Sequence, residues 1–196
     1  MDWRKESEMF DQTADYYDQF RPSYPAEIID MILSTTRVNA DSRLLEIGSG
    51  SGKATQLFAS HSLRIDCIDP GERLVERGRI KFAECQNISF DLGRFEEAAL
   101  QPKQYDLIFS AQAFHWIPQL VGYEKCAYTL KDDGYIALFW NMYITRNKSI
   151  DNELVQISQK HGGFADFLTE DECGERISSV SAEIVEQGYA LDSSAY

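Results

Sequence analysis

The segment that most constrains the fold is a glycine-rich stretch between a short apolar run and a helical pattern. Residues 43–47 read as a buried strand. Three glycines follow the strand at alternate positions, at Gly48, Gly50 and Gly52, and apolar residues then recur at helical spacing from Lys53 onward. Because glycine lacks a Cβ and reaches positive φ at little cost, this unit predicts a loop where a ligand contacts the main chain.

Two nucleotide-binding loops are similar to this stretch, and the spacing argues against both. A dinucleotide fingerprint, G-x-G-x-x-G, counted from Gly48 needs a third glycine where the chain has Lys53. A P-loop, G-x-x-x-x-G-K-[ST], ending at this lysine needs a glycine at Ile47 and a hydroxyl residue at Ala54. What remains is an acidic residue, Glu46, two positions before G-x-G-x-G.

Length, charge and cysteine content limit the class of protein. We expect the 196 residues to form a single domain, with capping helices at 1–40, a ligand-binding core at 41–141 and a helical segment at 142–196. The net charge of −13 disfavours binding to nucleic-acid phosphates. The sequence shows neither a membrane-spanning apolar segment nor a signal peptide, and its four cysteines form no C-x-x-C pair. We therefore expect a cytoplasmic protein without a membrane or nucleic-acid partner.

The N-terminal region predicts two helices, one over 10–20 and one from Pro25 through Leu33. The simpler interpretation is that both helices cap a sheet. A second interpretation starts from a group of aromatic and cationic side chains around the turn between them, which are Tyr16, Tyr17, Arg21 and Tyr24. Such a group is able to close over a ligand, with the guanidinium pairing a carboxylate.

Strands and helices alternate along the rest of the chain. The run at 105–110 is almost entirely apolar, as expected for a parallel strand buried on both faces. The predicted strands are 43–47, 63–68, 88–92, 105–110 and 135–140, with a turn at 132–134 before the last of them. This order predicts an α/β, doubly wound, mostly parallel Rossmann-like sheet that binds its ligand at the carboxyl ends of the strands.

Asp69 ends the second predicted strand, about twenty residues beyond the glycines. In doubly wound sheets an acid at this position accepts hydrogen bonds from ribose hydroxyls. The alternative is an N-cap for the helix that follows. The position relative to the glycine loop favours the ribose role.

Five segments together resemble the class I S-adenosylmethionine (SAM)-dependent methyltransferases, in particular the small-molecule group with the methyltransferase type-11 domain. They are 17–25 (YDQFRPSYP), 44–52 (LLEIGSGSG), 68–70 (IDP), 93–96 (GRFE) and 105–116 (YDLIFSAQAFHW). The resemblance implies a Rossmann-like methyltransferase fold, SAM as cofactor and transfer of a methyl group to a small molecule.

The resemblance also implies roles for individual residues. The glycines would lie against the methionine part of SAM, Glu46 would fix the loop and the amino group, and Asp69 would bind the ribose. The full cofactor-binding set that it implies is Glu46, Gly48, Ser49, Gly50, Gly52, Asp69, Pro70, Phe95, Glu96, Ala111, Gln112, Tyr17 and Arg21. Phe95 and Glu96 would flank the adenine. Many relatives carry an Asp where this chain has Arg94, so the backbone amide of Phe95 is a candidate replacement there.

A second departure lies after Trp140. The sheet of this family usually ends with an antiparallel pair of strands, but the chain continues with helical patterns at 150–160 and 168–186. A sixth strand is conceivable only at 188–191. We therefore expect a truncated or trimmed version of the fold with one uncovered sheet edge, which favours self-association into a homo-oligomer.

Methyl transfer from a sulfonium needs an in-line approach and a site that excludes water. A base is needed only if the acceptor must lose a proton, and His115 is the candidate catalytic residue for that role. Its alternative role is that of a packed histidine beside its tryptophan neighbour. The predicted walls of the substrate pocket are Tyr16, Tyr24, Phe114 and Trp116. The three histidines do not share ligand spacing, so no metal is expected.

These observations predict a SAM-dependent methyltransferase that acts on a small molecule. Two alternatives stay open. A protein that keeps the SAM pocket without catalysis is favoured by the expected loss of the terminal strands. A nicotinamide-dependent oxidoreductase on the same fold is disfavoured by Lys53 in place of the third fingerprint glycine.

Overall fold

The computed structural model describes residues 22–144, 147–160 and 168–191. The chain divides into two compact units, at residues 1–140 and 141–196, and each is described by itself. The predicted helix over 10–20 lies outside the described residues, as do Tyr16, Tyr17 and Arg21.

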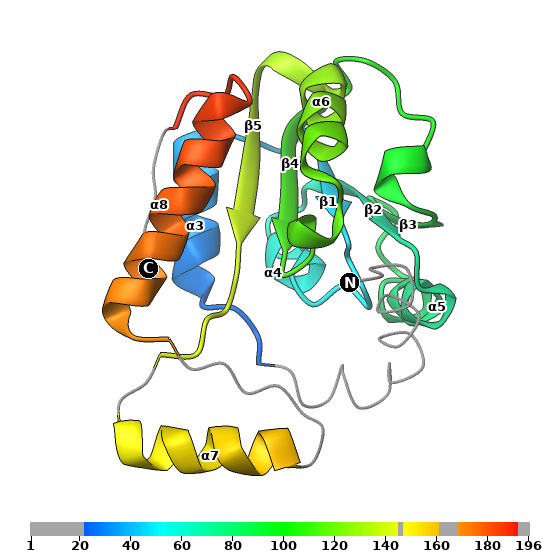
Figure 1. Cartoon of the computed structure of the whole chain (residues 1–196). Coiled ribbons are helices and arrows are strands. Elements are labelled where there is room, and N and C mark those ends of the chain that lie inside the picture. Colours follow the sequence, from blue (N-terminus) through cyan, green and yellow to red (C-terminus); the bar gives the residue numbers. More distant parts are fainter. Residues whose placement is uncertain (1–21, 145–146, 161–167, 192–196) are drawn as a thin grey trace. The chain divides into compact units, whose positions relative to one another are not determined.

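The first unit is built on a five-stranded sheet in the order β3-β2-β1-β4-β5 (Figure 1). All four strand pairs are parallel. The strands are β1 (Arg43–Ile47), β2 (Arg64–Asp69), β3 (Ile88–Leu92), β4 (Tyr105–Ala111) and β5 (Leu130–Phe139). The chain leaves the central β1 toward β2 and β3, and then crosses back to β4 and β5. The predicted doubly wound, Rossmann-like class is confirmed, and ligands in such sheets bind at the carboxyl ends beside this reversal.

Three helices share one hydrophobic cluster with the sheet. They are α3 (Ala26–Thr36), α4 (Thr55–Ala59) and α5 (Glu72–Lys81). Ile29 and Ile32 lie three residues apart on α3 and are both buried, as the apolar spacing of the sequence predicts. The rings of Phe58 from α4 and Phe109 from β4 lie 4.2 Å apart at the centre of this layer. This packing fixes the helix that follows the glycine loop against the sheet.

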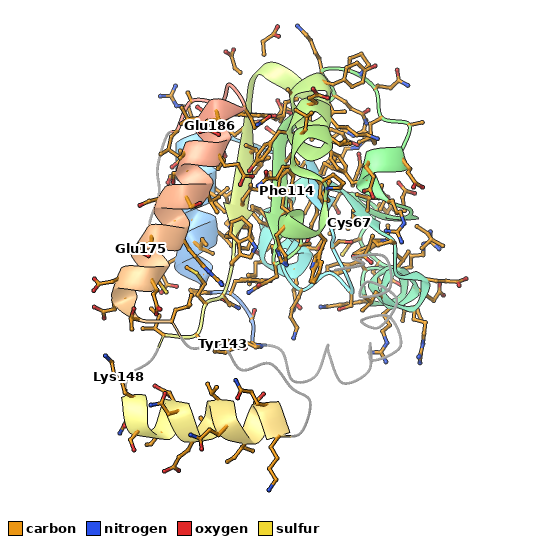
Figure 2. The ribbon with its side chains drawn as sticks, viewed as in Figure 1. Cys67, Phe114, Tyr143, Lys148, Glu175 and Glu186 are labelled. Atoms are coloured by element: carbon orange, nitrogen blue, oxygen red, sulfur yellow. The ribbon has the colours of Figure 1, made fainter. Side chains whose placement is uncertain are left out.

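The helix α6 (Gln119–Thr129) packs by Tyr123 and Cys126, which are fully buried. Phe114, labelled in Figure 2, lies in a short 3-10 helix (Phe114–Trp116) and packs its ring 4.9 Å from that of Tyr123. A second 3-10 helix (Phe95–Glu97) follows β3 and contacts α6. The helix α6 therefore supports both short helices that leave the carboxyl ends of the strands.

The strand β5 begins earlier than predicted. The turn predicted at 132–134 is wrong, because these residues lie within β5. The register with β4 moves from Tyr105↔Leu130 to Leu107↔Tyr135, so that residues 131–134 face a single residue, Asp106. The Asp-Asp-Gly sequence thus forms a bulge instead of a turn.

The second unit contains the helices α7 (Lys148–Lys160) and α8 (Glu170–Glu186), drawn in yellow and in orange to red in Figure 1. The start of α8 is fixed by a capping box between Thr169 and Glu172. Within the described ranges, residues 188–191 form no strand, and the sheet contains no antiparallel pair. No helix in this part of the molecule or in the first unit, as far as they are described, has the length and apolarity to cross a membrane.

Candidate cofactor and methyl-acceptor site

The glycine loop is held against the carboxyl end of β2. The Gly48 and Ser49 amides both donate to the Ile68 carbonyl, at 2.8 and 3.3 Å. Gly48, Gly50 and Gly52 all adopt positive φ, at 68°, 55° and 83°. The sequence therefore places glycine where the loop needs left-handed backbone, as predicted.

Asp69 ties the loop to the start of α5. Its Oδ2 accepts a hydrogen bond from the Gly50 amide at 2.8 Å, and its Oδ1 accepts one from the Gly71 amide at 2.8 Å. The N-cap of α5 is Gly71, without a side-chain cap hydrogen bond, so the N-cap alternative for Asp69 is wrong. The ribose role stays a prediction.

A pocket lies at the carboxyl ends of β1, β2 and β4, on the side predicted for the ligand. It brings together nine of the predicted cofactor-binding and catalytic residues, which are Gly48, Gly50, Asp69, Pro70, Phe95, Glu96, Ala111, Gln112 and His115. Trp116, from the predicted substrate wall, also lines it. Apolar side chains from successive strand ends and helices complete the walls. The pocket is therefore continuous from the glycine loop to the segment that leaves β4.

Several predicted residues lie elsewhere. Glu46 is buried, accepts a hydrogen bond from the Thr55 hydroxyl and is absent from the pocket lining. A Cβ on Gly52 would come within 2.5 Å of the Phe82 ring, so this glycine allows close packing of the loop. Tyr24 packs edge-on to Phe139, at 5.1 Å between rings, outside the lining.

Two further predicted residues are buried outside the lining. Ser49 has a buried Oγ that bonds to no described residue. Phe114 is enclosed against α6 and so acts as a support beneath the pocket segment.

The lining also includes residues that the sequence interpretation did not assign to the site. These are Ile47, Ile68, Leu74, Arg94, Ala113 and Ile117. Most of them are next in sequence to a predicted site residue near the end of a strand. Proximity in sequence to those residues would therefore have identified them. Leu74 lies in the first turn of α5, and the sequence predicts it only as an apolar helix residue.

Lys125 of α6 holds the 3-10 helix on one side of the pocket. Its Nζ donates to the Glu96 carbonyl at 3.0 Å and to the Ala98 carbonyl at 2.5 Å, and it lies 5.4 Å from the centre of the Phe95 ring. Burial lowers the pKa of the Lys125 ammonium. Because Glu96 and Phe95 line the pocket, this lysine fixes the wall predicted to contact the adenine.

Replacing Lys125 with methionine is expected to lower SAM affinity about tenfold, because the side chain stays unbranched and similar in size but loses two charge-assisted hydrogen bonds to the wall. Calorimetric titration with SAM measures the effect. Lys131→Met is the matched control, since Lys131 pairs with Asp106 at the opposite end of the strands. Equal affinity of both variants would show that the wall is held without Lys125.

His115 lines the pocket from the 3-10 helix after β4. Its Nδ1 accepts a hydrogen bond from the Trp140 indole Nε1–H at 3.1 Å, and its ring lies 4.7 Å from that of Trp116. Three residues earlier, Gln112 adopts a left-handed φ of 62°, and its backbone N–H donates to the Phe139 carbonyl at 3.0 Å. A non-glycine residue in this conformation marks a locally strained turn at the pocket.

The described residues contain no group of three or more His, Cys, Asp or Glu side chains suited to hold a metal ion. They do fit the cofactor that the sequence predicts. A Cβ on Gly50 would meet no described atom within 4 Å, so the bare backbone leaves open space beside the pocket. The buried Oε1 of Glu96 bonds to no described residue and is an acceptor for an amino group such as that of adenine.

Comparison with known proteins agrees with this assignment. The methyltransferase domain family matches residues 45–138. An uncharacterized methyltransferase of Mycobacterium tuberculosis is 32% identical over 125 residues, which cover 64% of this chain and 49% of that protein. The malonyl-[acyl-carrier protein] O-methyltransferase of Priestia megaterium is 32% identical over 111 residues, covering 56% of this chain and 39% of the relative.

The comparison with solved structures agrees with the fold. A SAM-dependent methyltransferase structure from Aquifex aeolicus aligns with a TM-score of 0.62 at 16% identity, covering 84% of this chain and 80% of that one. The chain covers 49% of the length of the mycobacterial relatives, which is about half of it. The family match lies over the strands and loops that form the pocket, so residues 45–138 form a methyltransferase domain of the class I SAM-dependent type.

Proposed function

We propose that this protein transfers the methyl group of SAM to an oxygen atom of a small-molecule acceptor by in-line displacement. The observation that carries the proposal is the continuous pocket, which runs from Gly48 and Gly50 to His115 and Trp116. The methyl-donor loop and a wall of hydrogen-bonding and aromatic groups thus face one cavity. The O-methyltransferase named above as a relative supports oxygen as the acceptor atom.

The bound cofactor supplies a methyl group on a cationic sulfur, which is already a good leaving group. The chain supplies position and exclusion of water. The glycine loop and Asp69 bind the cofactor, the wall at Phe95 encloses it, and Trp116 with His115 contacts the acceptor. A pocket with apolar walls strengthens the few polar contacts inside it.

Calorimetric titration of the purified chain with SAM, S-adenosylhomocysteine and NAD tests the cofactor. We expect binding of the first two only, and about 2.7 kcal/mol of added stability at a hundred times the dissociation constant. Transfer of labelled methyl groups to small molecules then separates an enzyme from a protein that binds SAM without catalysis. Binding of NAD in preference to SAM would favour the oxidoreductase alternative.

Replacing Asp69 with alanine is expected to lower SAM affinity about 10- to 100-fold, because two amides lose a charged acceptor and the ribose loses its partner. Adenosine and 2′-deoxyadenosine separate these two effects. The parent should prefer adenosine, whereas the variant should bind both equally weakly. A variant that keeps the preference would assign Asp69 to the loop alone.

A further inference from the structure

The glycine loop and the segment that leaves β4 meet inside the pocket. A Cβ on Gly48 would lie 2.2 Å from the Cβ of Ala113, so the methyl group of Ala113 fills the place that a side chain at position 48 would take. Gly48 directly follows β1, and Ala113 lies two residues beyond the end of the neighbouring β4. Both residues line the pocket. One methyl group therefore lies between the predicted cofactor loop and the predicted acceptor wall.

Hydrogen bonds hold both sides of this contact. The Gly48 amide donates to the Ile68 carbonyl at 2.8 Å, which fixes the loop to β2. The residue before Ala113 is Gln112, whose backbone N–H donates to the Phe139 carbonyl of β5 at 3.0 Å. Protein interiors are close-packed, so a change in the size of a packed side chain displaces its neighbours. The distance between the loop and the wall therefore depends on the side chain at position 113.

We propose that Ala113 is a positioning residue whose methyl group sets the distance between the cofactor loop and the acceptor wall. This assignment deepens the proposed function and rests on it. In-line displacement needs the acceptor on the axis of the carbon–sulfur bond, and a misplacement of about 1 Å lowers the rate about 100-fold. Glycine at position 113 would leave a gap and loosen the wall, whereas a larger side chain would push the wall away. In both cases the acceptor leaves the axis, although the loop still binds SAM.

Exchanging the methyl group between the two residues tests the contact without a ligand. Gly48→Ala places a Cβ against that of Ala113, and Ala113→Gly removes the atom with which it collides. We expect the stability loss caused by Gly48→Ala to be about half as large in the Ala113→Gly background as in the parent. The positive φ of 68° accounts for the rest. Urea unfolding of the four proteins measures these losses, and equal losses in both backgrounds would overturn the contact.

The positioning role is measured by transfer of labelled methyl groups from SAM to catechol, a hydroxyl probe. We expect Ala113→Gly to lower kcat about tenfold while the KM for SAM stays unchanged. Ala137→Gly is the matched control with an unchanged kcat, since Ala137 is a β5 residue outside the lining of the pocket.

The exchanged variant, Gly48→Ala/Ala113→Gly, separates positioning from stability. It should be less stable than Ala113→Gly but have a higher kcat, because its methyl group fills the same place from the side of the loop. A merely structural role predicts that kcat falls together with stability. An exchanged variant with no higher kcat than Ala113→Gly would overturn the proposal.

SAM and S-adenosylhomocysteine provide a measurement that needs no acceptor. They differ by the transferable methyl group and its positive charge, so the ratio of their dissociation constants reports how the wall contacts that methyl group. We expect Ala113→Gly to weaken SAM relative to S-adenosylhomocysteine about threefold, and Ala137→Gly to leave the ratio unchanged.

The two proposals fail in different ways. A parent that binds SAM but methylates no small molecule would overturn the proposed function. The ratio would still decide whether Ala113 sets the distance, since an unchanged ratio in Ala113→Gly would overturn this role whichever acceptor the protein uses.

Discussion

Replacing Gly50 with alanine is expected to lower SAM affinity at least about 100-fold while the protein remains folded. A Cβ at this position would meet no described atom within 4 Å, and Gly50 lines the pocket. The added methyl group therefore enters the space of the ligand and not that of the protein. The positive φ of 55° costs about 1–2 kcal/mol of stability for alanine. Titration calorimetry and denaturant unfolding measure the two effects separately.

Gly48→Ala is the informative comparison. At Gly50 the added methyl group mainly lowers SAM affinity, whereas at Gly48 it mainly lowers the stability of the fold. A Cβ on Gly48 would lie 2.2 Å from the Cβ of Ala113, far inside contact distance. The loop or the segment after β4 must move, so we expect a loss of about 3 kcal/mol or more in the free energy of unfolding. If Gly50→Ala bound SAM as tightly as the parent, the cofactor would not approach this face of the loop.

The strands were predictable because the pattern of apolar residues that marks each strand lies within the strand itself. The predicted 43–47 and 88–92 match β1 and β3 residue for residue, since each is a short apolar or alternating run bounded by polar or turn residues. The boundary of β5 was not predictable. Asp132 and its neighbours read as a turn, and only pairing with β4 keeps them in the strand as a bulge. The bulge depends on a partner strand that local sequence does not contain.

The sequence predicts which loops form the candidate site, but it predicts less well which side chains in those loops line the pocket. A glycine needed for ligand approach and one needed for packing look the same in sequence. Gly50 borders open pocket, whereas Gly52 makes room for Phe82. The contact between His115 and Trp140 likewise depends on β4 and β5 being neighbours, which their order in the chain does not require.

Glu46 shows most clearly what tertiary structure adds. An acid two residues before the glycines predicts a contact with the cofactor, and that role is still a prediction. In the structure the side chain is 1% exposed and lies beside the Thr55 hydroxyl and the Cys67 thiol. Burial raises the pKa of Glu46 from 4.5 to about 8, and the hydrogen bond from Thr55 offsets only part of that rise. The carboxyl group is therefore protonated in the folded protein at neutral pH.

A raised pKa in the folded state makes stability fall as pH rises. Below about pH 4.5 both states hold the Glu46 proton, and its contribution to stability is fully present. Between pH 4.5 and about 8 the unfolded chain loses this proton while the folded chain keeps it. The free energy of unfolding then decreases by about 1.4 kcal/mol per pH unit from this group. Above about pH 8 the contribution is lost and the dependence ends.

Replacing Glu46 with glutamine should remove this dependence, because the amide keeps the volume and the acceptor for Thr55 but does not ionise. We expect the free energy of unfolding of Glu46→Gln, relative to the parent, to rise by about 3–4 kcal/mol between pH 5 and pH 8. Urea unfolding at each pH measures it. Glu84→Gln, at an exposed position, is the control, and its curve should stay parallel to that of the parent. A parallel curve for Glu46→Gln as well would mean that the buried carboxyl is ionised in the folded protein, with a cation compensating its charge.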